Sequence, residues 1–126
     1  MNKYNNYDYD CKYHIVIFTN WRYFLLENEE IINTLQNKII DMQREKQFQL
    51  LEFNAFNNMV YLKVQCVPDV SPLTLMKHIR HQTAIDIKNR FPKIKKSVPA
   101  IWTKKGILST NTISKESIQE FIEKEL

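Results

Sequence analysis

The sequence has little cysteine, little glycine and no long apolar run. Its two cysteines, Cys11 and Cys66, are too few for a disulfide framework, so we expect a reducing compartment, the cytoplasm. No apolar stretch is long enough for a signal peptide or a membrane span, so we expect no association with a membrane. Gly106 is the single glycine, and we expect it to interrupt a strand.

The length and composition fit one folded domain. The chain has 126 residues, of which 44% are hydrophobic, enough for a core of its own. Residues 1–12 are polar, rich in Asn and Tyr and without period, which predicts a flexible N-terminal arm. Residues 13–126 are then predicted to form a single domain, and no internal repeat is visible in them.

A strand near the middle of the chain, within residues 57–67, is predicted from strict alternation. Val60, Leu62, Val64 and Cys66 share one face, and Met59, Tyr61, Lys63 and Gln65 share the other. The first face is apolar and indicates a buried side. On the second face, Met59 and Tyr61 stand two residues apart, where a pair of side chains could meet a site or a partner.

The remaining segments complete an alternating order of elements. Strands are predicted at 13–19, 48–53 and, interrupted, 100–109, with a turn at 54–58. The first of these is an apolar run of β-branched and aromatic residues, which indicates cover on both of its faces. Asn28 and Ser71 are typical helix caps, and Pro92 is a helix stop that is followed by a predicted basic loop at 93–96. The order indicates an α+β fold, a ferredoxin-like βαββαβ arrangement with a four-stranded antiparallel sheet and an additional C-terminal helix capped by Ser114.

Positive charge is concentrated in residues 77–105. This segment holds nine Lys and Arg residues and one acid, Asp86, so it carries +8, and since the whole chain carries +4 the remainder carries −4. Because the positive charge is confined to this one segment, contact with nucleic acid is favoured over an ordinary solvated face. The candidate contacts are Lys77, Arg80, Lys88, Arg90, Lys93, Lys95, Lys96, Lys104 and Lys105.

Three residues after the first strand are candidates for stacking on unpaired bases. Trp21, Arg22 and Tyr23 have the side chains that nucleic-acid-binding proteins use for this purpose. Packing of the loop is an equally good interpretation of them.

A family resemblance rests on three stretches. These are residues 13–26 (YHIVIFTNWRYFLL), residues 71–92 (beginning SPLTLMKHIR and ending in Phe-Pro) and Ile101-Trp102 before Gly106. In order and spacing they resemble the single-tyrosine HUH transposases of small insertion sequences, the TnpA type that moves as single-stranded DNA. The resemblance covers residues 13–125. It implies a homodimer in which the last helix of one subunit lies against the other.

The same resemblance implies that the family's chemistry has been lost. Met59 and Tyr61 stand where the family has two metal-binding histidines, and a thioether and a phenol are poor ligands for magnesium or manganese. Phe121 stands at the nucleophilic tyrosine and cannot form a phosphotyrosine link. Glu125 stands at the metal-assisting glutamine. We therefore expect no enzymatic activity, no metal and no cofactor.

Simpler interpretations apply to each of these positions. Met59 and Tyr61 can merely cover the sheet, and Phe121 fits the apolar stripe of its helix. His78 and His81 are three apart on a helix, but no third metal ligand is visible. Tyr13, Tyr23 and Tyr61 could each replace a nucleophile, but no second cluster of carboxylates or histidines would support one.

Two functional hypotheses follow. The first is a catalytically inactive, transposase-like homodimer that binds single-stranded or hairpin DNA, or RNA, and acts as a regulator. The alternative is a protein-interaction module that uses the sheet face around Met59 and Tyr61 and does not bind nucleic acid.

Overall fold

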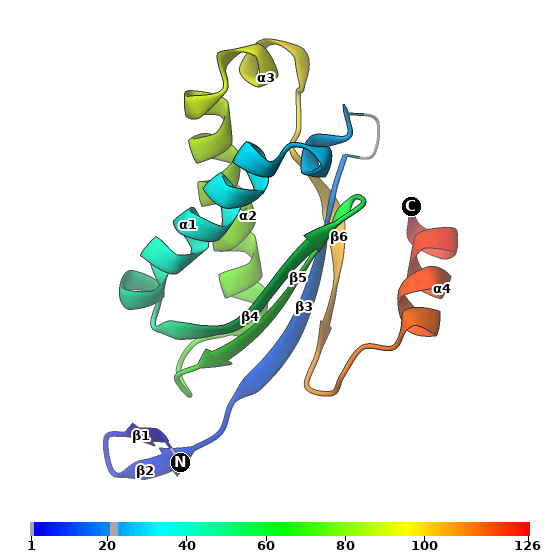
Figure 1. Ribbon diagram of the computed structural model, residues 1–126. Helices are drawn as coiled ribbons and strands as arrows, with labels where there is room; N and C mark the ends of the chain where they lie inside the picture. The colour runs from blue at the N-terminus through cyan, green and yellow to red at the C-terminus, as the bar shows by residue number, and fades with distance from the viewer. Residues whose placement is uncertain (1, 21–22) are drawn as a thin grey trace.

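The chain is built on a four-stranded antiparallel sheet with helices on both of its faces (Figure 1). A computed structural model describes residues 2–20 and 23–126. The four strands are β3 (Lys12–Thr19), β4 (Phe48–Phe56), β5 (Met59–Cys66) and β6 (Trp102–Ser109), in the spatial order β4-β5-β3-β6. All three pairings are antiparallel. The predicted ferredoxin-like α+β fold is therefore confirmed.

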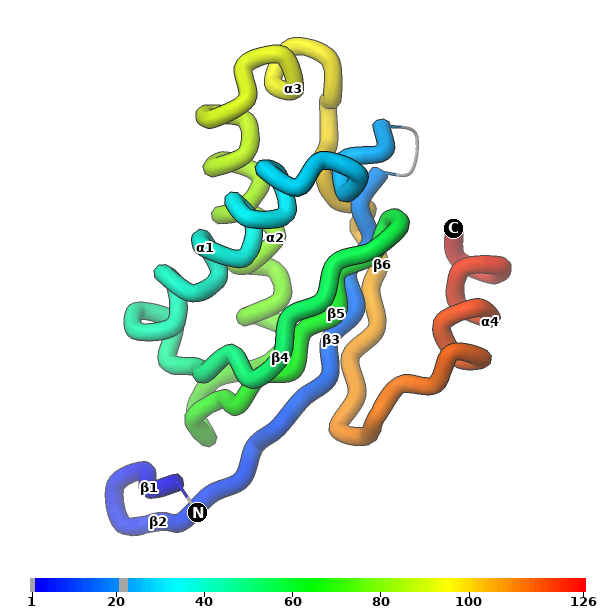
Figure 2. Tube along the Cα trace, in the orientation of Figure 1, coloured from blue at the N-terminus to red at the C-terminus, as the bar shows by residue number. Residues whose placement is uncertain are grey.

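The helices α1 (Glu29–Lys46) and α2 (Pro72–Arg90) cover one face of the sheet, as the Cα trace also shows (Figure 2). Both begin at the predicted caps: Asn28 accepts from the Glu30 amide at 2.9 Å, and Ser71 accepts from the Thr74 amide at 3.3 Å. Gln47 ends α1 in a left-handed conformation with φ 57°. Side chains at helical spacing on each helix then face the sheet.

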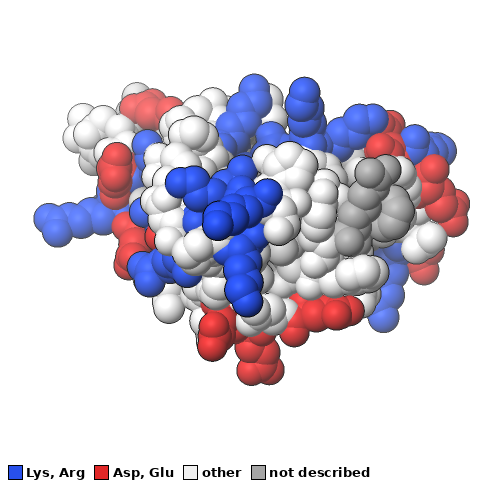
Figure 3. Space-filling model, turned by 90° about the horizontal axis from the view of Figure 1, so that it is seen from above, with Lys and Arg blue, Asp and Glu red and all other residues white. Residues whose placement is uncertain are grey.

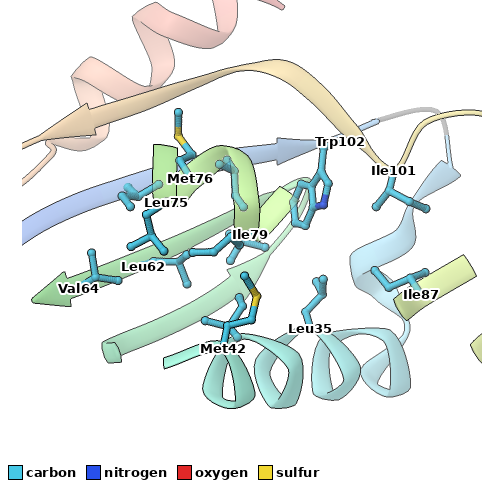
Figure 4. Packing of buried hydrophobic residues seen from close by; sticks show 14 of the residues in the cluster. Leu35, Met42, Leu62, Val64, Leu75, Met76, Ile79, Ile87, Ile101 and Trp102 are labelled. Atoms are coloured by element: carbon cyan, nitrogen blue, oxygen red, sulfur yellow. The ribbon is translucent and has the colours of Figure 1, made fainter. Parts of the chain in front are cut away.

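The main core lies between these two helices and the sheet (Figure 4). Leu35 of α1, Ile79 and Ile87 of α2 and Leu62 of β5 are all buried there. Trp102 closes one end of the core, and its indole Nε1 donates to Thr83 Oγ1 at 3.0 Å. This bond supplies the partner that a buried indole N–H requires.

The C-terminal helix α4 (Lys115–Glu125) lies on the opposite face of the sheet (Figure 1). Ser114 caps it and accepts from the Ser117 amide at 3.1 Å. Beneath α4 a smaller cluster buries Val16, Phe18 and Met59. Because both faces are covered, β3 is buried from His14 to Thr19, which confirms the prediction for this strand.

The N-terminal segment differs from the predicted flexible arm. Residues 2–9 form a two-stranded ribbon, β1 (Asn2–Tyr4) and β2 (Tyr7–Tyr9), and Lys12 already belongs to β3. Asn5 allows the tight turn because it adopts a left-handed conformation with φ 54°. The Tyr4 hydroxyl donates to Asp69 at 2.8 Å and ties the ribbon to the loop before α2.

Three further predictions of loops and turns differ from the structure. The predicted loop 93–96 is a short helix, α3 (Pro92–Ser97), which Pro92 opens at its first turn and Ile94 anchors on the core. The last strand is continuous through Gly106, whose lack of a side chain serves packing: a Cβ there would lie 2.8 Å from the Val16 carbonyl oxygen. The β4–β5 turn needs only Asn57 and Asn58, so β4 extends to Phe56.

None of the helices in the described part of the chain has the length and apolar character needed to cross a membrane.

Candidate nucleic-acid interface

A groove between α2 and residues 99–104 gathers part of the predicted basic surface. Its volume is about 470 Å³, and Lys77, Arg80 and Lys88 of α2 line it together with Lys104 of β6. Arg80 follows Lys77 by three residues and Lys88 follows Arg80 by eight, spacings close to whole turns that put the three on one side of the helix. Lys104 is two residues from Trp102, so both point to the α2 side of the sheet. We call this the basic groove.

Two of the four cations in the basic groove are held by backbone carbonyls. Arg80 Nη1 donates to the Thr103 carbonyl at 3.2 Å, and Lys88 Nζ donates to the Pro99 carbonyl at 3.0 Å. These bonds join α2 to the chain that leads into β6 and leave most donors of each cation available. Lys77, Lys104 and His81 are exposed at the groove without such anchoring. The groove thus combines fixed and adaptable positive charges.

Five of the predicted cations lie outside the basic groove: Arg90, Lys93, Lys95, Lys96 and Lys105. Lys93, Lys95 and Lys96 are exposed on α3. Figure 3 views the molecule from the end where α3 lies, and Lys and Arg side chains gather at the centre of that view while acids lie nearer its rim. Arg90 is partly neutralised, since its Nε contacts Asp86 Oδ1 at 3.1 Å.

Lys105 does not belong to this surface. Alternation along β6 directs it to the α4 side, where its Nζ contacts Glu125 Oε2 at 2.6 Å. The hydrogen bond and charge of Lys105 lower the pKa of the Glu125 carboxyl. Lys104 and Lys105 therefore lie on different faces, because neighbouring residues of a strand point to opposite sides, and contact of Lys105 with nucleic acid stays a prediction.

Of the three predicted stacking residues, Tyr23 is exposed and lies two residues before the 3₁₀ segment Leu25–Glu27. Trp21 and Arg22 lie outside the described residues.

The α4 face brings together three of the positions singled out in the sequence. Met59 is 9% exposed and packs in the same cluster as Tyr61 and Phe121. The Phe121 ring stacks on that of Phe18, with centroids 5.2 Å apart and planes 11° apart. These positions do converge across the sheet and helix, but as packed apolar groups.

Tyr61 has a partner that the sequence reading missed. Its hydroxyl lies 2.7 Å from His14 Nδ1, and the two rings are stacked with centroids 5.9 Å apart. Burial, and secondarily the charge of Glu52, raise the pKa of Tyr61. A sequence signal for this pairing exists: His14 stands two residues before Val16 and so shares its face of β3, the strand that pairs with the strand of Tyr61. The expectation that Met59 and Tyr61 form an exposed pair is wrong for Met59, because α4 covers it.

The residues at these positions do not fit a divalent metal. Met59 offers a thioether inside an apolar cluster, and the Tyr61 phenol is held by His14. Within residues 2–20 and 23–126, no three His, Cys, Asp or Glu side chains converge in the manner of a metal site. His78 and His81 open onto separate hollows of α2, so they do not form a joint site.

The fold and the basic groove define an α+β protein with one strongly cationic end, and sequence comparison identifies its family. The family model described as "Transposase IS200 like" matches residues 7–125. The chain belongs to this family of IS200-like transposases, and its resemblance to TnpA-type proteins is confirmed. No curated protein matches the chain in sequence.

Two solved structures share the fold. A protein from Deinococcus radiodurans R1, provisionally assigned as a transposase, matches with a TM-score of 0.82 at 22% identity, over 98% of this chain and 96% of that one. A REP-associated tyrosine transposase bound to a REP hairpin matches with a TM-score of 0.61 at 13% identity, over 95% of this chain and 68% of that one. At these identities the likeness establishes the fold.

Proposed function

We propose that this chain is a nucleic-acid-binding member of the IS200-like transposase family that has no transposase activity. The observation that carries the binding proposal is the basic groove, in which Lys77, Arg80, Lys88 and Lys104 line one hollow about 470 Å³ in volume. A row of cations on two elements can follow the repeating charges of a phosphate backbone.

The ligand we propose is hairpin or single-stranded DNA, or RNA of similar shape. A relative with the same fold is bound to a REP hairpin, which supports a folded-back strand as the preferred form. The exposed lysines of α3 add positive charge beyond the groove and offer contacts to further phosphates of the same strand. Phosphate contacts position a ligand without reading its sequence.

The absence of activity is proposed from the side chains on the α4 face. Phosphoryl transfer of the family's kind needs a nucleophilic hydroxyl and a metal close together. Phe121 has no hydroxyl, and Met59 and Tyr61 are packed and hydrogen-bonded in ways that leave no ligand set. A protein that binds the family's nucleic acid without cutting it could regulate access to that sequence.

We also propose that the protein forms a homodimer. No residue of α4, a helix that the structure describes in full, is more than half-buried. Residues 110–114 join this helix to β6. An exchange of α4 between two copies would therefore keep the same contacts while leaving the rest of each subunit intact. Light scattering at micromolar concentration tests this, and a monomer would contradict it.

The binding test compares two variants with the same loss of charge. The double substitution Lys77→Ala and Lys104→Ala removes two groove cations that make no hydrogen bond to the backbone of the described residues. The control, Lys115→Ala and Lys124→Ala, removes two exposed cations from α4. Anisotropy with a labelled hairpin is measured over a range of salt concentrations. We expect the groove variant to reduce the salt slope by roughly two units, since each phosphate contact releases about one counterion, and the control to reduce it little.

A third variant, Lys93→Ala with Lys95→Ala and Lys96→Ala, tests the α3 lysines, with an expected reduction of roughly two to three units. If neither the groove variant nor the α3 variant differs from the parent, the cations form an ordinary solvated surface and the binding proposal is wrong.

The activity test incubates the protein with labelled hairpin DNA and magnesium or manganese. We expect neither cleavage nor a covalent protein–DNA band on a denaturing gel. Capture of such a band would overturn the proposed loss of activity.

A further inference from the structure

Two cysteines lie opposite each other at one end of the sheet. The β3–β5 register pairs Lys12 with Gln65, so the next position of the same antiparallel register sets Cys11 opposite Cys66. The Cys66 amide donates to the Cys11 carbonyl at 2.9 Å, which is one of the two bonds that residues of a hydrogen-bonded pair exchange. Both residues are free thiols. We call them the cysteine pair.

The geometry of the cysteine pair suits a disulfide. Hydrogen-bonded residues opposite each other on antiparallel strands have Cα atoms about 5.5 Å apart, within the range of about 4.4–6.8 Å that a disulfide spans. Their side chains also point to the same side of the sheet. Cys66 lies on that side in the main core, and Tyr13, two residues after Cys11, packs against the same core.

The backbone that carries Cys11 is held in place by a buried amide. Gln65 is 3% exposed, and in the orientation that satisfies both ends of its side chain, its Oε1 accepts from the Cys11 amide at 2.7 Å. Its Nε2 then donates to Asp10 Oδ1 at 3.3 Å. The segment that leads into β3 is thus fixed beside the end of β5, so rotation of the two cysteine side chains is enough to bring their sulfur atoms together.

The two thiols differ in reactivity. Cys66 is fully buried, and this burial, with a smaller contribution from the charge of Cys11, raises the pKa of the Cys66 thiol to about 11. At neutral pH this thiol is therefore protonated and closed to reagents in solution. Cys11 is half-buried, so a small reagent reaches it first. An accessible thiol beside an enclosed one is the arrangement of an attacking and a resolving cysteine.

We propose that Cys11 and Cys66 form a reversible disulfide by exchange with a small-molecule disulfide of the glutathione class. The Cys11 thiolate attacks one sulfur of that molecule, which forms a mixed disulfide and releases one thiolate. Cys66 Sγ then attacks Cys11 Sγ, and its proton passes to the second thiolate as this leaves. The two cysteines together lose two electrons, and the small disulfide is reduced to two thiols.

The cysteine pair lies at the end of β3 where the N-terminal ribbon joins the sheet (Figure 1). The ribbon reaches β3 through Cys11, and the chain after Cys66 leads to Asp69, to which Tyr4 of the ribbon donates. A disulfide would therefore fasten the base of the ribbon close to its existing contact. The basic groove is at the other end of β3, where Trp102 pairs with that strand. Oxidation thus strengthens the hold on the ribbon and leaves the groove unchanged.

The test follows the mass of the protein and uses no nucleic acid, so its outcome is independent of the proposed function. The reduced parent is incubated with oxidised glutathione, and the thiols that remain are alkylated after denaturation. We expect the parent to lose two hydrogen atoms, to take up no alkyl group and to carry no glutathione. A covalent dimer on a non-reducing gel, a lasting glutathione adduct or two alkylated cysteines would overturn the proposal.

Two single substitutions test the order of attack. Cys66→Ala keeps the accessible thiol, so the reaction should stop at one bound glutathione. Cys11→Ser keeps the enclosed thiol and should take up no glutathione while it is folded, which circular dichroism checks at the same temperature. The proposal is wrong if Cys66→Ala takes up no glutathione, or if folded Cys11→Ser takes up one.

Thermal unfolding tests whether the bond fits the native strand pairing. The disulfide would close a long loop, from residue 11 to residue 66, so the oxidised parent should melt about 5–15 °C above the reduced parent. Dithiothreitol should restore the lower melting temperature, and Cys11→Ser should show the same value with and without oxidised glutathione. An oxidised parent that melts no higher than the reduced one, or that dithiothreitol does not reverse, would contradict the proposal.

Discussion

The two faces of the sheet differ in how much of the fold they hold. On the face covered by α1 and α2, long side chains such as Leu35, Leu62 and Ile79 are almost fully buried. On the face covered by α4, the buried apolar cluster holds only Val16, Phe18 and Met59 among the described residues, and α4 itself contributes half-buried residues. The first face is the source of stability. The second can change its side chains, and hence its chemistry, at little cost to the fold.

The largest expected effect is on the α1–α2 face. Leu62→Ala removes a fully buried side chain from the central part of the core and should lower the free energy of unfolding by about 2–5 kcal/mol. Chemical denaturation followed by circular dichroism measures this. A loss below that for an α4-face truncation would contradict the comparison.

Alkaline pH should also weaken the α1–α2 face through Cys66. Burial, and secondarily Cys11, raise the pKa of the Cys66 thiol from 9.0 to about 11. The folded state thus favours the protonated thiol, so its contribution is complete below pH 9 and is lost as the pH rises toward 11, by about 2 kcal/mol. Denaturation curves at pH 8 and pH 10.5 measure the loss, and Cys66→Ala, although less stable at pH 8, should show a smaller further decrease.

A smaller effect is expected on the α4 face. Phe121→Ala removes the ring that stacks on Phe18 and should cost about 1–2 kcal/mol, below the loss for a fully buried aromatic, since Phe121 is only half-buried. Hydrogen exchange should then show faster exchange in residues 115–125 with the α1 and α2 amides unchanged. Uniformly faster exchange in all helices would show that the two faces are not independent.

The smallest effect is expected for Glu125→Gln. The Lys105–Glu125 pair is solvent-exposed, and pairs of this kind add little to stability. The lowered pKa of Glu125 means that any contribution is present at neutral pH and is lost as the pH falls through the acidic range. The melting temperature at pH 7 should therefore be unchanged within error. A clear decrease would indicate that this contact holds α4 on the sheet.

Much of the fold could be predicted because its signals are local. Alternation in β5 separated Val60, Leu62 and Val64 from Met59 and Tyr61, and the structure places the two sets on opposite faces of the sheet. Polar caps fixed the starts of α1, α2 and α4, since a Ser or Asn side chain satisfies amides within its own turn.

The errors arose where distant contacts override local pattern. The ribbon at residues 2–9 is held by Tyr4 against Asp69, and α3 is anchored through Ile94, contacts that no short stretch of sequence reveals. Gly106 was read as an interruption, but it lies within a continuous strand because a neighbouring backbone passes close to it.

The candidate sites show the same division. The sequence by itself determined which side chains are present: nine cations within residues 77–105, and Met59, Tyr61 and Phe121 at positions where the family resemblance implies metal ligands and a nucleophile. Tertiary structure alone decided their grouping. It placed Lys104 in the basic groove and Lys105 beside Glu125, joined Tyr61 to His14, and stacked Phe121 on Phe18. The physical reason is that charge and side-chain type belong to each residue, whereas a groove or pocket exists only where separate elements pack together.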